Sequence, residues 1–357
     1  METIESIQWL RESNLYENAQ NLSAQLKSVF INCLGARDEK ILIIGDRGSQ
    51  QKEIAPVLAG AYYLAAQSLN LNAKLVMQEQ KSRGSTSDND VRNSIMDLRD
   101  NNILAVNASD RLGSIPEMGK SFRKYCIKRK FKFVSSVGLG SLYTSQMDIL
   151  MSAININYKS LQAQHERIRK IFDEADELHI TTEKGTDVYF DIKGVKSQSS
   201  DGNYIEAGTG GNLPAGDVFI APNGKRIEGR VVIDGSTKLI NRTILLKEPI
   251  TLTIEDGAIT EILGGEEADM LEKTLDKSAK ISKYPNSVRR IGEFGLGMNT
   301  NASLIGASII DEKALGTAHI GIGSNYWFGG TIYSIIHLDQ VFMYPSVYAD
   351  GKLIEIS

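Results

Sequence analysis

The stretch KILIIGDRGS, residues 40–49, has the pattern of a buried strand that runs into a glycine turn. A helical pattern follows it to about Leu69, and residues 72–77 (NAKLVM) form the next apolar strand pattern. Two further strand patterns, at 102–109 and 131–138, continue the alternation. Short apolar strands separated by helices are typical of βαβ units with parallel strands. The first half of the chain is therefore predicted to be an α/β domain with a mainly parallel sheet.

The composition excludes several classes of protein. The chain has 357 residues, of which 41% are hydrophobic and 24% charged, and its net charge of −4 argues against a nucleic-acid-binding surface. The longest apolar run, residues 55–66, is too short to span a membrane, and the acidic N-terminus lacks the features of a signal peptide. We expect a cytoplasmic protein that binds neither nucleic acid nor membranes.

From about residue 178 the pattern changes to alternating strands joined by short glycine turns. Asn-Gly and Asp-Gly pairs between strands are strong hairpin signals. The clearest are Asn223-Gly224, Asp234-Gly235, Asp256-Gly257 and Asp350-Gly351. The chain is therefore predicted to have two domains, an α/β domain at 1–175 and a β-rich (α+β) domain at 176–357.

Two of the four histidines lie in HIGIGSNYWFGGTIYSIIHLD, residues 319–339. Side chains alternate between the faces of a strand, so His337 and Asp339 point the same way. A hairpin that turns at 329–330, with a small bulge or an irregular loop at SNYW (324–327), would place His319 across from His337. This concentration of ligand-type residues favours a metal site over a structural His–Asp pair.

Two further carboxylates lie in apolar surroundings. Glu293 stands between glycines in IGEFGLGMN (291–299), and Asp217 begins an apolar strand after a glycine-rich loop. An unpaired carboxylate is unfavourable in such a place, so both are expected to have partners. Two histidines and three carboxylates suit one or two divalent ions.

Three other features are interpreted as structural. The turn GDRGS (45–49) lacks the third glycine and the later acidic residue of a dinucleotide site, so it is predicted to be an ordinary turn between strand and helix. His165, among charged residues on a helix near 157–177, is predicted to be a solvent-exposed surface histidine. His179 is predicted to be a structural strand residue.

A series of segments follows in a characteristic order through the second half of the chain. They are KGTDVYFDIKG (184–194), GGNLPAGDVFIAP (210–222), DGS (234–236), KEPITLTIEDGAITEILGG (247–265), RRIGEFGLGMN (289–299), DEKALGTAHIGIG (311–323) and FGG…IHLD (328–339). This order resembles the M29 metallo-aminopeptidases, the leucyl aminopeptidase/aminopeptidase T group. The resemblance covers nearly all of 178–357, whereas the first half shares only the α/β pattern.

The resemblance implies a co-catalytic site with two metal ions. The implied metal ligands are Asp217, which stands where the family has a glutamate, Glu293, His319, His337 and Asp339. The family also has a tyrosine seven residues after the first histidine, and Tyr326 stands there. This tyrosine either donates a hydrogen bond in catalysis or packs beside its aromatic neighbours.

The leading hypothesis is a metallo-aminopeptidase, a hydrolase of the metalloprotease class that removes N-terminal residues from peptides. Two divalent ions, of zinc, cobalt or manganese, would activate a water molecule, with Glu293 bridging them or acting as the general base. The resemblance also implies a homodimer, the commonest oligomer of soluble proteins.

The same residues support two alternatives. His319, His337 and Asp339 form a 2-His-1-carboxylate set, as in mononuclear non-haem Fe(II) oxygenases. Ring-cleaving dihydroxypyridine dioxygenases resemble the aminopeptidase group in their C-terminal region, so a small-molecule substrate is the alternative to a peptide. Glu293 and Asp217 favour the hydrolase, because one iron(II) ion needs no extra carboxylates. The third hypothesis is a non-catalytic descendant that keeps the fold as a binding module.

Overall fold

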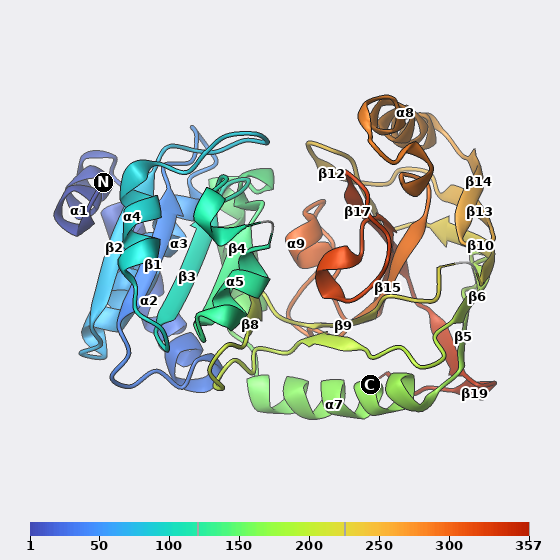
Figure 1. The fold of residues 1–357 in the computed structure, drawn as a ribbon, viewed down its shortest axis with the longest axis horizontal. Coiled ribbons are helices and arrows are strands. Elements are labelled where there is room, and N and C mark those ends of the chain that lie inside the picture. The colour runs from blue at the N-terminus through green and yellow to red at the C-terminus, as the bar shows by residue number, and fades with distance from the viewer. Residues whose placement is uncertain (120, 225, 357) are drawn as a thin grey trace. The chain divides into compact units, whose positions relative to one another are not determined.

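The structure is a computed structural model that describes residues 1–119, 121–224 and 226–356 (Figure 1). Within these ranges it contains one five-stranded parallel sheet and two seven-stranded antiparallel sheets. The predicted fold class, an α/β domain followed by a β-rich domain, is confirmed. Among the helices of these residues, none is both long and apolar enough to cross a membrane.

Contacts between Cα atoms divide the chain into two compact units. Unit 1 comprises Met1–Tyr158 and Gly202–Ala215, and unit 2 comprises Lys159–Asp201 and the chain from Gly216 onward. The predicted boundary at residue 175 differs from this division in two ways: residues 159–175 belong to unit 2, and the chain returns to unit 1 at 202–215 for a short strand. That strand pairs with the open edge of the parallel sheet and satisfies its backbone groups.

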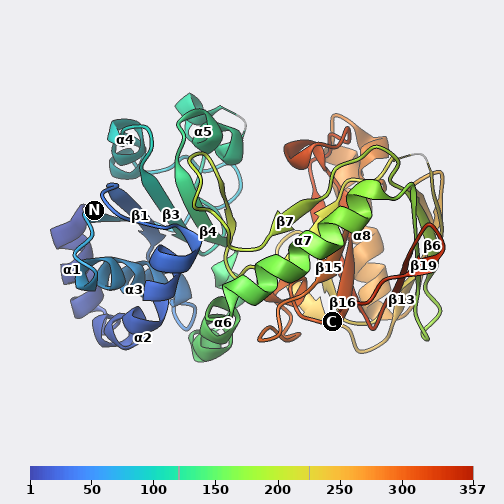
Figure 2. The same ribbon diagram turned by 90° about the horizontal axis from the view of Figure 1, so that it is seen from below.

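Unit 1 is an α/β unit built on the parallel sheet, with strand order β2-β1-β3-β4-β8. Its strands are β1 (Ile41–Asp46), β2 (Ala73–Gln78), β3 (Ile103–Ala108), β4 (Lys132–Val137) and β8 (Gly210–Asn212). Its helices are α1 (Thr3–Glu12), α2 (Tyr16–Ser28), the π-helix η1 (Val29–Cys33), α3 (Ile54–Ser68), α4 (Asn89–Asp97), α5 (Phe122–Lys128) and α6 (Met147–Ile154), with 3-10 turns η2 (Pro116–Met118), η3 (Leu139–Ser141) and η4 (Thr144–Gln146). Helices α4 and α5 cover one face of the sheet and α1 to α3 the other (Figure 2).

Unit 2 contains both antiparallel sheets. The first has the order β14 (Ala258–Leu263), β13 (Ile250–Glu255), β10 (Ile227–Ile233), β6 (Asp187–Asp191), β5 (Glu177–Thr181), β18 (Ser346–Ala349) and β19 (Lys352–Leu353). The second has the order β12 (Thr243–Leu245), β11 (Ser236–Lys238), β17 (His337–Met343), β16 (Thr317–Gly323), β15 (Ile291–Gly297), β9 (Asp217–Ile220) and β7 (Gln198–Ser200). The helices are α7 (Tyr158–Glu174), whose first residue belongs to unit 1, α8 (Glu266–Ile281), α9 (Ser308–Asp311), and 3-10 turns η5 (Pro285–Ser287) and η6 (Tyr326–Phe328).

The core of unit 2 lies between its two sheets and α7. The ring of Phe294 on β15 lies 5.1 Å from the ring of Phe190 on β6 and 6.2 Å from that of Phe172 on α7. Successive residues of a strand point to opposite faces, so Phe294 faces this core while its neighbour Glu293 faces away from it. One face of the second sheet is therefore committed to apolar packing, and the other is free to carry polar groups.

The prediction that His165 is exposed is wrong. His165 is fully buried, and its Nδ1 lies 2.7 Å from Oγ of Ser199 on β7. It belongs to the stripe of α7 that includes Leu161, Ile168 and Phe172, all of them buried. This spacing of three and four residues is the helical period. The charged sequence neighbours of His165 lie on other faces of the helix and concealed the stripe.

We expect His165 to make the fold less stable in acid. Burial, together with the charges of Lys313 and Arg169, lowers its pKa from 6.5 to about 3. Between these pH values the imidazole binds a proton in the unfolded chain but not in the folded protein. The contribution of the neutral His165 to the free energy of unfolding is therefore complete above pH 6.5 and is lost as pH falls toward 3. Denaturant unfolding of wild type and His165→Gln, each at about pH 7 and about pH 4.5, measures it. The variant should lose about 2 kcal/mol less on acidification; equal losses would contradict a neutral buried imidazole.

Candidate metal centre

The five predicted ligands all lie on the polar face of the second antiparallel sheet. They are Asp217 on β9, Glu293 on β15, His319 on β16, and His337 and Asp339 on β17. Residues paired across a sheet share a face, as do residues two apart along a strand. Gly321 pairs with both Glu293 and Asp339, and Gly297 pairs with Asp217, so the register itself brings the ligands to one side.

The register of β16 and β17 differs from the predicted one. His319 pairs with Val341 and His337 pairs with Gly323, without a bulge, so the prediction that the two histidines face each other is wrong. They are offset by four residues, about 13 Å of strand at roughly 3.3 Å per residue. Asn325 holds the connecting loop in this register, because its side chain accepts a hydrogen bond from the Ile332 N–H at 2.7 Å and donates one to the Gly292 carbonyl at 2.9 Å.

Glu293 connects the two histidines. Its Oε1 lies 3.4 Å from Nε2 of His319, and its Oε2 lies 3.4 Å from Nε2 of His337. Two groups share this carboxylate, Asp217–Glu293–His319 and Glu293–His337–Asp339, and the ligand atoms of each lie within 4.8 Å of one another. Among the described residues, His319, His337 and Asp339 do not form such a group, so the expected 2-His-1-carboxylate triad is replaced by one that includes Glu293.

Two glycines leave the space that these side chains occupy. A Cβ on Gly321 would lie 2.8 Å from Cβ of Glu293 and 3.0 Å from Cε1 of His337. A Cβ on Gly295 would lie 2.3 Å from Nε2 of His319. These distances are too short for any real side chain, so the ligand positions require glycine on the neighbouring strands.

His337 has the hydrogen bonding of a metal ligand. Its Nδ1 lies 2.8 Å from the carbonyl oxygen of Ser324, which can only accept, so Nδ1 carries a proton. Its Nε2 lies 3.0 Å from Oδ1 of Asp339. Burial disfavours the charged ring, but Asp339 and Glu293 outweigh burial and raise the pKa of His337 to about 9. The position facing Nε2 thus attracts positive charge, and with two carboxylates and one oriented imidazole the donor set fits a divalent ion.

His319 lacks this support. It is 1% exposed, and its Nδ1 is buried with no hydrogen-bond partner among the described residues. Burial disfavours its charged form, but Glu293 raises the pKa overall. Metal-binding histidines almost always donate their second ring nitrogen to an outer partner, which His337 does and His319 does not.

Two lysines that the sequence analysis did not identify complete the charge of the site. Nζ of Lys313 lies 2.7 Å from Oδ1 of Asp217 and 2.8 Å from Oε1 of Glu312. Burial opposes the charge on Lys313, but these carboxylates outweigh it and raise the pKa of the ammonium group. Lys313 lies in the short connection between α9 and β16, where a lysine is usually solvent-exposed, and only the fold shows it to be buried.

The second lysine contacts the other end of the ligand row. Nζ of Lys238 on β11 donates to Oδ2 of Asp339 at 2.7 Å, and Oγ of Ser308 lies 3.1 Å from the same oxygen. Burial raises the pKa of Asp339, but Lys238 and His337 outweigh burial and hold it well below its usual value. Asp339 is therefore ionised, with Oδ1 directed to His337.

An aromatic group borders the site at His337. The ring of Trp327 lies 5.9 Å from that of His337, 4.5 Å from Phe328 and 6.3 Å from Phe219. Tyr326 instead contacts Tyr333, with 3.9 Å between ring centroids and the rings tilted by 32°, and is 42% exposed. Its role as a catalytic hydrogen-bond donor stays a prediction.

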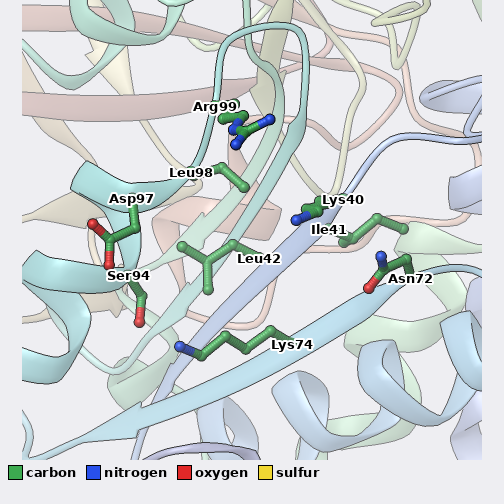
Figure 3. A pocket seen from close by; sticks show the side chains of 9 residues that line it. All are labelled: Lys40, Ile41, Leu42, Asn72, Lys74, Ser94, Asp97, Leu98 and Arg99. Atoms are coloured by element: carbon green, nitrogen blue, oxygen red, sulfur yellow. The ribbon is translucent and has the colours of Figure 1, made fainter.

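A pocket of about 260 Å³ lies in unit 1, at the start of β1, and holds none of the predicted ligands (Figure 3). It is lined by Lys40, Ile41, Leu42, Asn72, Lys74, Ser94, Asp97, Leu98 and Arg99. Its single carboxylate and lack of histidine do not suit a transition metal. The polar face of β9 and β15–β17 is therefore a better candidate for a metal site than this pocket.

A family model described as 2,5-dihydroxypyridine 5,6-dioxygenase (NicX) matches residues 144–355, a span that holds all five predicted ligands. The chain belongs to the NicX family. A 2,5-dihydroxypyridine 5,6-dioxygenase of Pseudomonas putida is 27% identical over 198 residues, which are 52% of this chain and 55% of that protein. The match thus spans about half the length of this relative.

Two solved structures share the fold of this NicX family member. A 2,5-dihydroxypyridine dioxygenase from Pseudomonas putida matches with a TM-score of 0.74 and 20% identity, over 94% of this chain and 95% of that one. AmpT from Thermus thermophilus, an M29 aminopeptidase, matches with a TM-score of 0.60 and 16% identity, over 94% and 99%. At such identities the likeness shows the fold alone. The M29 resemblance is confirmed as a shared fold, while the family that matches is the related dioxygenase branch.

We expect Gly321→Ala to weaken metal binding. The added methyl group would press on Glu293 and His337 and separate their donor atoms, so affinity for Mn²⁺ should fall by about tenfold or more. Gly224→Ala is the control, because a Cβ there would make only ordinary contacts, at 3.6 Å from Arg290 and 3.8 Å from Ile332. Isothermal titration of both variants provides the comparison. Unchanged affinity in Gly321→Ala would place the ion elsewhere.

Proposed function

We propose that this protein is a metal-dependent, ring-cleaving dioxygenase that acts on a dihydroxylated pyridine or a closely similar ring, with one ion held by Glu293, His337 and Asp339. The observation that carries the proposal is the family match over residues 144–355, which includes all three residues. The relative from Pseudomonas putida, named as a 2,5-dihydroxypyridine 5,6-dioxygenase, supplies the substrate class. The alternative in the sequence analysis is thereby preferred to the aminopeptidase.

The charges around the site support one ion rather than two. With His337 neutral as a metal ligand, four carboxylates face two ammonium groups. This leaves two negative charges, which one divalent cation would balance. The carboxylates are Asp217, Glu293, Glu312 and Asp339, and the ammonium groups are Lys238 and Lys313. From the sequence alone the extra carboxylates indicate two ions, because no local pattern marks the lysines that neutralise them. This balance removes the main argument for the two-metal hydrolase.

Different residues of the site would bind the metal ion and accept a proton. An iron(II) ion would supply reactivity toward dioxygen. His337, oriented by the Ser324 carbonyl, would hold it through Nε2. Oε2 of Glu293 is buried without a hydrogen bond among the described residues, so it is free either to bind the ion or to accept a proton from a substrate hydroxyl group.

The aromatic group beside His337 supports a planar substrate. The His337 side chain is 22% exposed, whereas Glu293 and Asp339 are 5% and 4% exposed, so the site is open to solvent on the histidine side. Trp327, 38% exposed, lies on that side. An aromatic ring that approached His337 could stack on or against Trp327.

The first test is the reaction itself. Protein loaded anaerobically with Fe²⁺ should consume dioxygen in the presence of 2,5-dihydroxypyridine and show loss of the ring absorbance. Protein loaded with Zn²⁺ should do neither, because zinc has no redox chemistry. Hydrolysis of leucine p-nitroanilide, measured in parallel with Zn²⁺, Co²⁺ and Mn²⁺, should be absent. Peptidase activity without oxygen uptake would favour the hydrolase, for which the AmpT-like fold is the supporting observation.

Two substitutions separate metal binding from turnover. His337→Ala should lose the ion, because nothing else on β17 can replace the oriented imidazole. Glu293→Gln keeps the volume and one oxygen donor, so it should retain much of the metal but lower kcat by about two to four orders of magnitude, since the proton acceptor is lost. Metal analysis and oxygen uptake on the same samples distinguish the two effects. Full turnover in Glu293→Gln would exclude it as the proton acceptor.

Trp327 tests the class of substrate. Trp327→Ala should raise KM for a dihydroxypyridine by about tenfold, and Trp327→Phe should restore most of the affinity, because stacking needs a ring and not an indole. Metal content should be the same in both variants. A KM that is unchanged in Trp327→Ala would place the substrate ring elsewhere.

The homodimer and the cytoplasmic location stay predictions.

A further inference from the structure

The two metal-type groups on the sheet differ in one respect. In Asp217–Glu293–His319, as in Glu293–His337–Asp339, the ligand atoms lie within 4.8 Å of one another, but an ammonium group already lies beside the first group. Nζ of Lys313 is 2.7 Å from Oδ1 of Asp217, which is the distance of a direct ion pair. A divalent ion bound to Asp217 would have to lie next to this positive charge.

Hydrogen bonds hold the backbone at Lys313 in place. The carbonyl of Lys313 accepts a hydrogen bond from the Asn299 N–H at 2.8 Å, and its own N–H donates to Ile310 at 3.0 Å. The chain runs so close to Gly297, the partner of Asp217 across the sheet, that a Cβ there would lie 2.9 Å from the Lys313 carbonyl carbon. The Lys313 side chain is only 3% exposed, so its ammonium group is enclosed together with Asp217.

Glu312 makes the arrangement a closed network. Its Oε1 lies 2.8 Å from Nζ of Lys313, and its Oε2 lies 2.9 Å from Oγ of Ser308, which also contacts Asp339. The Lys313 ammonium group thus lies between the carboxylates of Asp217 and Glu312. Through Ser308, Glu312 is also connected to Asp339 of the other metal-type group. Removing one charged side chain from such a network leaves its partners buried and unpaired.

We propose that Lys313 is a built-in cation that takes the place of a second divalent ion at Asp217–Glu293–His319, so that the protein binds one ion, at Glu293–His337–Asp339. The inference rests on the metal site of the proposed function but not on the reaction assigned to it. It accounts for a feature that a two-metal site would not have, an imidazole at His319 whose Nδ1 has no hydrogen-bond partner among the described residues. Lys313 would then determine how many ions this fold binds.

The test is a count of bound ions. Metal-free protein is titrated with Mn²⁺ by calorimetry and by native mass spectrometry. Wild type should bind one ion per chain. Lys313→Met, which keeps most of the length of the side chain but not its charge, should bind two. Lys313→Met/His319→Ala should bind one again, because the new site loses its imidazole. Lys280→Met, at an exposed lysine of α8, is the charge-matched control and should bind one.

A second variant, Asp217→Asn, tests the proposal independently in case Lys313→Met does not fold. Asp217→Asn leaves Lys313 paired with Glu312, and it should still bind one Mn²⁺, within about threefold of the wild-type affinity. If Asp217 were instead a metal ligand, Asp217→Asn would remove an ion or weaken its binding by about tenfold or more.

The outcomes separate this inference from the proposed function. Two ions in wild type, one ion in folded Lys313→Met, or loss of an ion in Asp217→Asn would each overturn it. One ion in wild type and two in Lys313→Met, together with no oxygen uptake on a dihydroxypyridine, would leave the inference standing and reject the reaction. A wild type that binds no Mn²⁺ would reject both.

Discussion

Carboxylates in a protein interior must be matched by positive charge, because an unpaired buried anion is strongly unfavourable. This constraint organises the polar face of the second antiparallel sheet. Glu293 lies between two histidines, Asp217 is paired with Lys313, and Asp339 is paired with Lys238 and His337. Each pairing uses a different strand or loop, so the charges can be satisfied only if the whole sheet and its loops are in place.

The sheet in turn depends on residues that carry no charge. Gly295 and Gly321 give room to the imidazole and carboxylate groups on neighbouring strands, and any side chain there would displace them. Behind them, Phe294 anchors β15 in the apolar core against Phe190 and Phe172. The alternation of a strand therefore links the site to the core: a slip by one residue would exchange Phe294 with Glu293.

The same fold is shared with proteins named as a dioxygenase and as an aminopeptidase, so the fold alone does not select the chemistry. We propose that the chemistry is selected by a small number of side chains around the row of candidate metal ligands. In this chain the histidine with an outer hydrogen-bond partner is His337, and the carboxylate neutralised by an ammonium group is Asp217. Both features support our proposal that a single ion lies at the half of the row that contains Asp339.

The amino-acid sequence by itself determined the fold class and the candidate ligands. Apolar strands alternating with helices, then Asn-Gly and Asp-Gly turns, report local backbone preferences and a two-residue or 3.6-residue period, which neighbouring residues set. The ligand types His337 and Asp339 were visible for the same reason, since two residues apart on a strand share a face.

Only the tertiary structure decided how these residues combine. The register of β16 and β17 separates the two histidines by four residues, Glu293 from a third strand reaches both, and Lys313 from a loop neutralises Asp217. These are contacts between strands and loops far apart in the chain, set by hydrogen-bond register and by the burial of a lysine. A local pattern carries no information about either, because register depends on the partner strand and burial depends on what packs above the residue.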